Sequence, residues 1–505
     1  MSENLEQLRE IDREIQLLEH TAALLEWDQE TYMPEQAIAE RAEQIALIQG
    51  LMHERITSSK TGNLLSLLGA TDDLPQGTSA ETAIDRAFVR EVFKRYSRNI
   101  KLPKDFVERL AKQQSLTQAE WAKARELSDF SLFAPYFTDL LELVVQKAEL
   151  LGFEANRYDP LLDEYEPWMK TSHVAGIFES LQGLLTDLLG KIASTNKKID
   201  NSFLHKSYDI SKQKKLSIAI LEAMGVSFKN SRLDTSAHPF STTLGHRDIR
   251  LTTRYLESLL SAGLFGTIHE AGHGLYEMGF DEQLAGSLLS GGTSLGIHES
   301  QSRMWENIIG RSLAFWRFFY PQAQNLFPEE LSDVADVDFY QAVNRVAPSL
   351  IRIESDEVTY NLHIILRFNL ENRLVNGSIK VADLPEAWKQ ECQSLLGVIP
   401  ENDAEGVLQD IHWSMGAIGY FPTYALGNLY AAQFFYKMKS DIPSLTRDIE
   451  HGKLHVILEW LRINIHRHGS VYPAEELCKR VTGETLNPDY FGSYLREKFG
   501  EVYAF

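Results

Sequence analysis

Apolar residues recur at intervals of three and four along most of this chain, which is the spacing that keeps one face of an α-helix apolar. The pattern is clearest in residues 36–56, 136–150 and 174–192. Proline is scarce, with 16 in the whole sequence, so few of these stretches are interrupted. The pattern therefore predicts a mainly α-helical protein.

One region breaks the helical spacing. From Ala237 the chain reads AHPFSTTLGHRDIRLTTRY, in which residues 242–244 and 249–253 form β-prone runs. The Gly-His-Arg stretch between them, residues 245–247, suits a turn, so we expect a β-hairpin. A small sheet should therefore precede the helix expected over residues 263–280.

Loop signals are short and widely spaced. They fall at residues 72–77, 158–160, 327–328 and 398–400. None of them is long or biased enough in composition to be an interdomain linker. We therefore expect residues 1–505 to form one continuous domain rather than a row of separate ones.

Composition limits the possible partners. Lys and Arg total 50 against 71 Asp and Glu, and the formal net charge of -21 repels nucleic-acid phosphates and anionic lipids. No tract is apolar over the roughly 18 residues that a membrane span needs. No secretory signal is visible, and Cys392 and Cys478 are too few for a disulfide framework or a Cys-rich zinc module. We expect a soluble, cytoplasmic protein without nucleic-acid or membrane partners.

The expected helix over residues 263–280 carries an HExxH motif at residues 269–273. Positions four apart lie above one another on a helix, so His269 and His273 can converge on one metal ion, most simply Zn2+. Glu270 follows the first histidine and can act as a general base toward an attacking water molecule. A second His pair, His451 and His455, has no glutamate after its first member and reads as an ordinary surface pair.

A catalytic zinc site needs a third protein ligand and one open position. Glu277 lies eight residues after His269, a helical rise of about 12 Å, and is too far away to serve. The Gly/Ser-rich stretch LAGSLLSGGTSLG allows the chain to reverse direction and to lay a second helix beside the first. Glu299 on that helix is the predicted third ligand, with His298 and Glu306 as alternatives. Water attack on a peptide carbonyl is the natural reaction of such a set.

Several separated motifs together resemble the carboxypeptidase Taq family of zinc-type metallocarboxypeptidases, and they follow the family's order essentially from end to end of the chain. They are WDQETYMP at residues 27–34, HPF at 238–240, DIRLT at 248–252, HEAGH at 269–273, HESQ at 298–301, IRIESD at 351–356 and GVLQDIHW at 406–413. The resemblance implies a helical, two-lobed fold around a deep groove, usually in a homodimer. It also implies release of single residues from peptide C-termini with broad specificity and with zinc or cobalt bound, and it agrees with Glu299 as a metal ligand.

A carboxypeptidase must bind a free C-terminal carboxylate, and the planar fork of an arginine suits that task. Arg352 in the IRIESD motif is the candidate that fits the resemblance, although it could instead pair with Glu354 or Asp356. Arg250 is the alternative, and Asp248 two residues away favours an architectural role for it.

Three further residues, His238, His412 and Tyr420, could donate hydrogen bonds to the substrate or to a developing oxyanion. Gln409 and Asp410 could orient His412, whereas Trp413, Phe421 and Tyr424 read as packing residues.

Two other functions remain open at this point. One is a zinc oligopeptidase or dipeptidyl carboxypeptidase, which would release products longer than one residue. The other is a helical scaffold protein with an inert site, against which the complete set of His269, Glu270, His273 and Glu299 argues.

Overall fold

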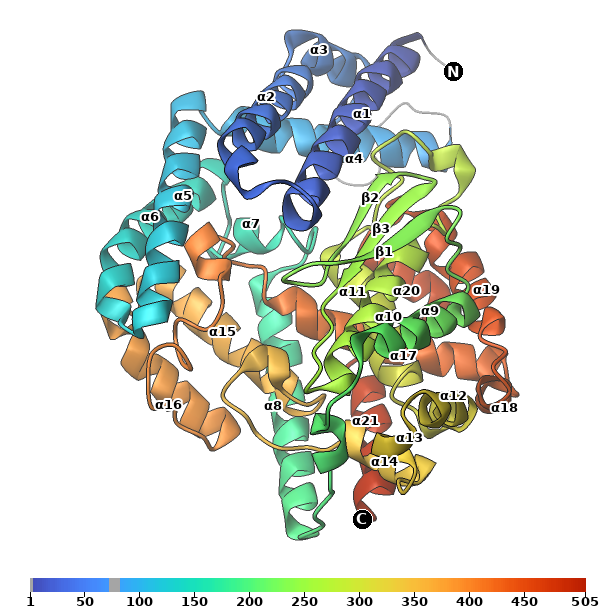
Figure 1. The fold of residues 1–505 in the computed structure, drawn as a ribbon. Coiled ribbons are helices and arrows are strands. Elements are labelled where there is room, and N and C mark those ends of the chain that lie inside the picture. Colours follow the sequence, from blue (N-terminus) through green and yellow to red (C-terminus); the bar gives the residue numbers. More distant parts are fainter. Residues whose placement is uncertain (1–2, 72–81) are drawn as a thin grey trace. The chain divides into compact units, whose positions relative to one another are not determined.

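The computed structural model describes residues 3–71 and 82–505, and they form a mainly α-helical protein with one small sheet (Figure 1). The predicted fold class is therefore confirmed. The loop predicted at residues 72–77 lies outside the described residues. None of the described helices combines the length and the apolar character that a membrane crossing requires.

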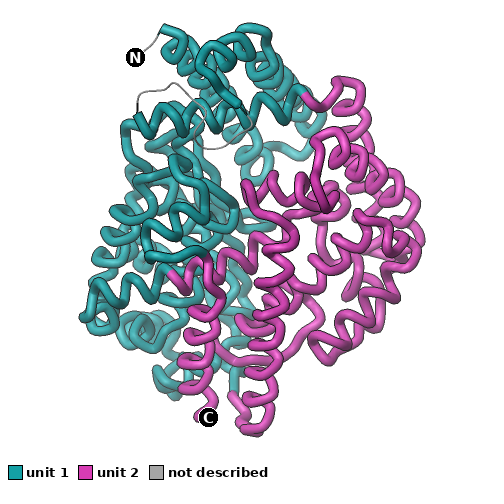
Figure 2. Tube along the Cα trace, turned by 180° about the vertical axis from the view of Figure 1, so that it is seen from behind, with its two compact units in different colours: residues 1–100, 200–343, 434–485 teal, residues 101–199, 344–433, 486–505 magenta. Residues whose placement is uncertain are grey.

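The chain divides into two compact units, each assembled from three separated segments and coloured separately in Figure 2. Unit 1 contains residues 1–100, 200–343 and 434–485, and unit 2 contains residues 101–199, 344–433 and 486–505. The expectation of one continuous domain concerns how the two units behave together, and it stays a prediction.

Unit 1 is built around helix α10, which is buried along several faces and contacts α9, α11 and the sheet. Its helices are α1 (Glu3–Thr31), α2 (Ile38–Ile56), α3 (Ser59–Leu67), α4 (Ala83–Lys101), α9 (Ile210–Met224), α10 (Leu260–Glu277), α11 (Leu295–Arg303), α12 (Leu313–Leu326), α13 (Pro328–Leu331), α14 (Asp336–Val343), the second part of α17 (Pro422–Asp441), α18 (Leu445–Glu450), α19 (His455–Asn464) and α20 (Ala474–Thr482).

The sheet of unit 1 has three strands in the order β1-β3-β2. Strands β2 (Ser241–Gly245) and β3 (Asp248–Thr253) are antiparallel, which confirms the predicted hairpin. Strand β1 (Ser231–Thr235) pairs with β3 in parallel and was not predicted. Strand β1 is only five residues long and Leu233 is its one apolar residue, so it carries no alternation clear enough to mark a strand.

Unit 2 consists of helices and the loops between them, with no strand among its described residues. It contains α5 (Lys104–Leu127), α6 (Phe130–Leu151), α7 (Asp159–Leu162), α8 (Thr171–Ser194), α15 (Thr359–Val375), α16 (Leu384–Leu396), the first part of α17 and α21 (Asp489–Tyr503). Helix α15 lies at its centre and contacts α6, α8 and α16.

Helix α6 shows how local sequence sets these elements. The side chain of Asp129 accepts a hydrogen bond from the Ser131 amide and caps its first turn. Gly152, at φ 87°, ends it in a conformation that favours glycine. Between them, apolar residues three and four apart are buried, as the predicted helix over 136–150 required.

Two loop predictions have different outcomes. Residues 398–400 lie outside any helix, as expected. Residues 159 and 160, by contrast, begin the short helix α7, so the loop prediction there was wrong. Pro160 stands in the first turn of α7, where a proline costs no hydrogen bond because that amide has no partner inside the helix.

Candidate metal centre

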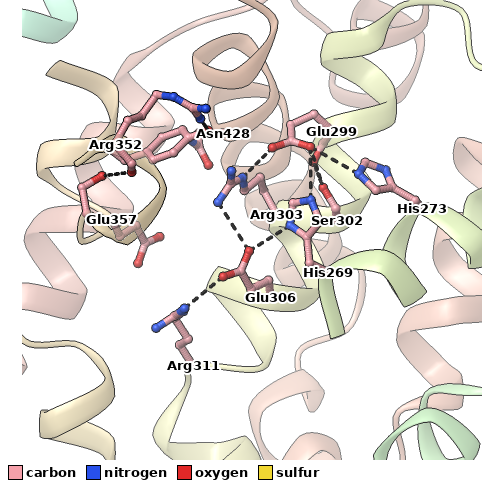
Figure 3. A network of polar contacts seen from close by, with 12 residues as sticks. His269, His273, Glu299, Ser302, Arg303, Glu306, Arg311, Arg352, Glu357 and Asn428 are labelled. Carbon is pink, nitrogen blue, oxygen red and sulfur yellow. Dashed lines mark hydrogen bonds and ion pairs between the residues drawn. The ribbon is translucent and has the colours of Figure 1, made fainter. Parts of the chain in front are cut away.

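Helix α10 presents both histidines of the HExxH motif on one face (Figure 3). Their Nε2 atoms turn toward the same carboxylate oxygen, Glu299 Oε2, at 3.6 Å from His269 and 3.4 Å from His273. One ligand atom of each of these three residues lies within 4.8 Å of the other two. The structure thus brings the three predicted ligands together.

A close helix crossing places Glu299. Helix α11 begins where the Ser294 side chain accepts a hydrogen bond from the Ile297 amide. Its backbone then passes Gly272, the fourth residue of the HExxH motif, so closely that a Cβ there would lie 2.6 Å from Ser302 Cα and 2.7 Å from the Gln301 carbonyl oxygen. Only a residue without a side chain allows this approach.

Glu299 is held by two neighbours on its own helix. Arg303 Nε donates to Glu299 Oε1 at 2.7 Å, and Ser302 Oγ donates to Oε2 at 3.0 Å. Burial alone would raise the pKa of Glu299, but Arg303 and the two histidines outweigh it and hold that pKa well below its usual range. The carboxylate is therefore ionised and presents Oε2 to the imidazoles.

Glu306, an alternative third ligand in the sequence analysis, lies behind His269 instead. Its Oε2 accepts a hydrogen bond from His269 Nδ1 at 2.9 Å, and its Oε1 accepts from Arg311 Nη2 at 2.9 Å. It stands in a π-helical turn, Met304–Ile309, that follows α11 directly. Because Nδ1 carries the proton, His269 Nε2 is left free to bind a metal.

His298, the other alternative ligand, lies behind His273. His273 Nδ1 is 3.1 Å from the His298 carbonyl oxygen and 2.7 Å from His298 Nδ1, and His298 Nε2 donates to Glu277 Oε1 at 2.7 Å. His298 Nε2 therefore carries the proton of its ring, and His298 Nδ1 can accept from His273. This arrangement also leaves His273 Nε2 free.

The electrostatics of the site suit a bound cation. Burial lowers the pKa of His273 to about 3, so its imidazole is neutral, as a metal ligand must be. Burial also raises the pKa of Glu270 to about 7, and this residue is only 7% exposed. Two imidazole nitrogens and one carboxylate oxygen are the donor set that zinc accepts in hydrolytic sites. The residues present therefore fit a single divalent metal.

Unit 2 holds the predicted carboxylate-binding residue, Arg352, in a buried ionic cluster. Arg352 Nε and Nη2 both donate to Asp410 Oδ1, at 3.0 and 2.6 Å, and Arg352 Nη1 donates to the Tyr360 hydroxyl at 3.0 Å. Arg367 Nε donates to Asp410 Oδ2 at 2.7 Å. Two guanidinium groups thus share one carboxylate. Asp410, not Glu354 or Asp356, is the ion-pair partner of Arg352.

Gln409 and Asp410 also differ from expectation, because their side chains bind the Arg352 segment and not His412. Gln409 Oε1 accepts from the Arg352 amide at 2.9 Å, and Gln409 Nε2 donates to the Leu350 carbonyl at 3.0 Å. The motifs at residues 351–356 and 406–413 are therefore joined to each other by hydrogen bonds. Two motifs 57 residues apart build one local structure.

His412 and Tyr420 lie side by side in unit 2, with ring centroids 5.2 Å apart. His412 Nε2 is 3.2 Å from the Tyr424 hydroxyl, so Tyr424 is more than the packing residue that we expected. Trp413 and Phe421 are buried, in agreement with packing roles.

His238 belongs to unit 1 and is exposed. The segment that carries it is fixed by Thr252, whose Oγ1 accepts a hydrogen bond from the Phe240 amide at 2.9 Å. Pro239 lies against Gly266, one turn of α10 before His269. Arg250 pairs with Asp248 and covers the Trp27 ring at 4.6 Å, which agrees with an architectural role.

Four residues of these clusters were not predicted from the sequence: Arg303, Arg311, Tyr360 and Arg367. Arg311 follows the metal helices without a motif of its own, and Arg367 stands among the apolar residues of α15. A buried arginine needs a carboxylate partner. The one signal in the sequence for such a partner was Asp410, two residues before the predicted site residue His412. His451 follows the end of α18 and His455 begins α19, so these two histidines do not share one helix.

Comparisons with known proteins place the whole chain beside metallocarboxypeptidases. Residues 7–499 match a family described as carboxypeptidase Taq (M32) metallopeptidase. Thermostable carboxypeptidase 1 of Thermus thermophilus is 40% identical over 98% of both chains, and carboxypeptidase 1 of Bacillus subtilis is 39% identical over 95% of both. The crystal structure of an M32 carboxypeptidase from Deinococcus radiodurans matches with a TM-score of 0.95 at 35% identity, covering 100% of each chain.

Proposed function

The chain belongs to the carboxypeptidase Taq (M32) family and is a metallocarboxypeptidase, and on that premise we propose that it removes single amino acids from the C-termini of peptides with broad specificity. The observation that carries the proposal is the convergence of His269, His273 and Glu299 on one point beside Glu270.

In this proposal His269 Nε2, His273 Nε2 and Glu299 Oε2 hold one divalent metal, with Zn2+ as the expected ion and Co2+ as a possible substitute. Glu306 and the His298–Glu277 pair keep both imidazoles in the required tautomer and orientation. When bound, the metal supplies a Lewis acid that polarises the scissile carbonyl and lowers the pKa of water toward neutrality.

Glu270 acts as the general base. Its carboxylate takes a proton from the attacking water and passes that proton to the leaving amine, so one group serves both halves of the reaction. Burial, which raises its pKa to about 7, makes it a stronger base than an exposed glutamate. A base with a pKa close to the working pH transfers protons efficiently in both directions.

Arg352 is the proposed recognition group for the substrate's C-terminal carboxylate. The cluster around it contains two guanidinium groups and one aspartate, and so carries a net positive charge in a buried setting. Arg352 Nη1 does not bond to Asp410 and donates instead to the Tyr360 hydroxyl. A peptide carboxylate would balance the charge of this cluster.

Hydrogen bonds to the rest of the peptide are assigned to three residues. Tyr420 and His412 would donate from unit 2, and His238 would donate from its exposed position before β2. Each has a polar ring group suited to a carbonyl oxygen or to a developing oxyanion.

The organisation of the enzyme is proposed on other grounds. Neither unit is a continuous stretch of chain, which supports a single catalytic domain over residues 1–505. The thiols of Cys392 and Cys478 are free and buried, which suits a reducing compartment such as the cytoplasm. A homodimer is proposed from the family resemblance, and analytical ultracentrifugation would test it.

Product analysis tests the function directly. The purified protein is incubated with one mixed-sequence peptide, with its C-terminal amide, and with the free peptide after chelator treatment. We expect free amino acids released in order from the C-terminus of the free acid, no cleavage of the amide, and recovery of the chelated sample by added Zn2+. Release of dipeptides would instead identify a dipeptidyl carboxypeptidase, and cleavage of both peptides at internal bonds an oligopeptidase.

A further inference from the structure

Glu371, on α15 in unit 2, is a buried carboxylate that the proposed chemistry does not use. Its side chain is 0% exposed, and its two oxygens accept three hydrogen bonds from neutral donors. Burying a carboxylate without an ion-pair partner lowers the stability of the fold, so a buried glutamate at this position needs an explanation. Burial raises the pKa of Glu371 to about 7, which is the physical expression of that cost.

The three donors show what Glu371 holds. Trp413 Nε1 donates to Glu371 Oε1 at 2.8 Å, while the Gly419 amide and the Tyr158 hydroxyl donate to Oε2 at 3.1 and 2.6 Å. Trp413 and Gly419 stand six residues apart, at the two ends of one turn. A single carboxylate therefore closes this turn and ties it to the start of α7.

The residues flanking the closed turn are two of the proposed substrate contacts. His412 directly precedes Trp413, and Tyr420 directly follows Gly419. Their rings lie 5.2 Å apart. The hydrogen bonds that Trp413 and Gly419 give to Glu371 therefore hold the backbone directly beside each of these two rings.

Both ends of the turn are packed tightly and have little freedom to adjust. Gly419 has φ 96°, and a Cβ there would lie 2.8 Å from the carbonyl carbon and oxygen of Leu161. The Trp413 ring stacks on Phe137 with a centroid distance of 5.7 Å and an interplanar angle of 9°. Loss of the carboxylate would leave buried donors unpaired, and the turn would have to shift to satisfy them.

The chemistry of the side chain explains why a glutamate is present. A carboxylate offers acceptors on both oxygens, whereas a glutamine offers one oxygen and places an NH2 group where the second acceptor is needed. Since the donors approach both oxygens, no neutral residue of the same shape can accept all three hydrogen bonds.

We propose that Glu371 is a positioning residue, which fixes His412 and Tyr420 at the separation needed to bind the peptide. This inference rests on the proposed function, because it assumes that His412 and Tyr420 contact substrate. It assigns Glu371 no contact with the substrate and no part in metal binding.

The test compares Glu371→Gln with the native protein through two independent measurements. Hydrogen exchange followed by mass spectrometry reports the mobility of residues 411–421, and steady-state kinetics on a free-acid peptide report kcat/KM. We expect faster exchange in this segment, a loss of kcat/KM of about tenfold, and unchanged metal content. Val174→Ala, a buried change in α8 of the same unit, should lower Tm without either effect on the turn or on kcat/KM.

The outcomes separate the two proposals. Unchanged exchange in residues 411–421, or native kcat/KM despite faster exchange, would overturn the role of Glu371. The proposed function itself is tested on the native protein alone. Absence of carboxypeptidase activity in that protein would overturn it. Should Glu371→Gln fail to fold, Trp413→Phe removes one donor and keeps the aromatic stack, and a smaller change in the same two measurements is expected.

Discussion

Glu306 Oε2 lies 2.9 Å from His269 Nδ1, while Nε2 of the same imidazole points to Glu299 Oε2 at 3.6 Å. The ring is thus held between two carboxylates with different tasks. Glu306 fixes the proton on Nδ1, and Glu299 is the proposed metal ligand. Arg303 pairs with both carboxylates and Arg311 pairs with Glu306, and this positive charge keeps both carboxylates ionised.

Glu306→Gln should weaken metal binding without removing a ligand. A glutamine can still accept from His269 through its oxygen, but its NH2 group then faces Arg311, so the imidazole loses its fixed orientation. The metal Kd should rise about ten- to a hundredfold, as is usual when a partner of a ligand is removed. Competition with a coloured chelator measures this Kd. Glu282→Gln, at an exposed glutamate, is the control and should leave the Kd unchanged.

Glu270→Gln should leave one metal ion per chain bound but reduce kcat by a factor of about 100 to 10,000, because an amide cannot take the proton of the attacking water. Elemental analysis of the dialysed variant gives the metal content, and release of the C-terminal residue gives the rate. Native turnover by a fully metallated Glu270→Gln protein would refute the general-base assignment.

Gly272→Ala should disrupt the metal centre from a position that contacts no ligand atom. The added methyl would meet the backbone of Gln301 and Ser302, so α10 and α11 must separate and carry Glu299 away from the histidines. We expect a stability loss of about 1–3 kcal/mol, typical of overpacking, together with weaker metal binding. Gly50→Ala is the matched control, since that exposed helical glycine has nothing within 4 Å of its missing Cβ. It should raise stability by about 0.5–1 kcal/mol.

Arg352→Ala should abolish the preference for a free carboxylate. The native enzyme is expected to cleave a free-acid peptide and to spare its amide, whereas the variant should lose most of its kcat/KM on the acid and treat both alike. Arg373→Ala, at a partly exposed arginine of the same unit, should keep the native preference. Equal cleavage of acid and amide by the native enzyme would show that Arg352 does not recognise the carboxylate.

Asp12 gives unit 1 a pH-dependent stability. Burial raises the pKa of its carboxyl from 3.8 to about 7, so the folded state keeps a proton that the unfolded chain releases above about pH 4. Stability should therefore fall as pH rises from about 4 to 7, with the full loss present above that range. Asp12→Asn should remove this loss and raise the free energy of unfolding at pH 8 by about 2 kcal/mol or more, with little change at pH 4.

Thermal unfolding at the two pH values checks the prediction. Asp85→Asn should change stability in the opposite direction. Asp85 pairs with Arg9 at 2.7 Å, and although burial acts to raise its pKa, hydrogen bonds hold that pKa below the usual value. That variant should be less stable than the native protein at pH 8. A lower Tm for Asp12→Asn at pH 8 would contradict the assignment of a buried, proton-holding Asp12.

Local sequence was enough to predict the helices, the hairpin and the metal motif. Helical spacing and the HExxH pattern depend on residues close together in the chain, so His269, His273 and Glu270 were identifiable without the fold. The turn of Gly and Ser residues before α11 also pointed to Glu299. In each case the signal lies close in the chain to the structure that it specifies, the longest separation being the 26 residues between His273 and Glu299.

Partnerships between distant segments were not predictable in the same way. Asp410 was expected to orient His412, its near neighbour in sequence, yet its side chain binds Arg352 and Arg367, which lie 58 and 43 residues away. Glu371 and Tyr158 meet across 213 residues. No periodicity in the sequence records such contacts, because a buried polar residue is specified by its partner and not by its neighbours in the chain.

The threefold division of each unit also bears on how the protein can be made. Unit 1 is not complete until residue 485 has been synthesised, and unit 2 needs residues 486–505. Arg90 in α4 illustrates the delay, since its Nη2 donates to the Ser470 carbonyl, 380 residues later. During translation the early helices must therefore wait, with apolar faces uncovered, for segments that leave the ribosome last. This order of synthesis predicts a nascent chain that depends on chaperones and has no independently folding N-terminal half.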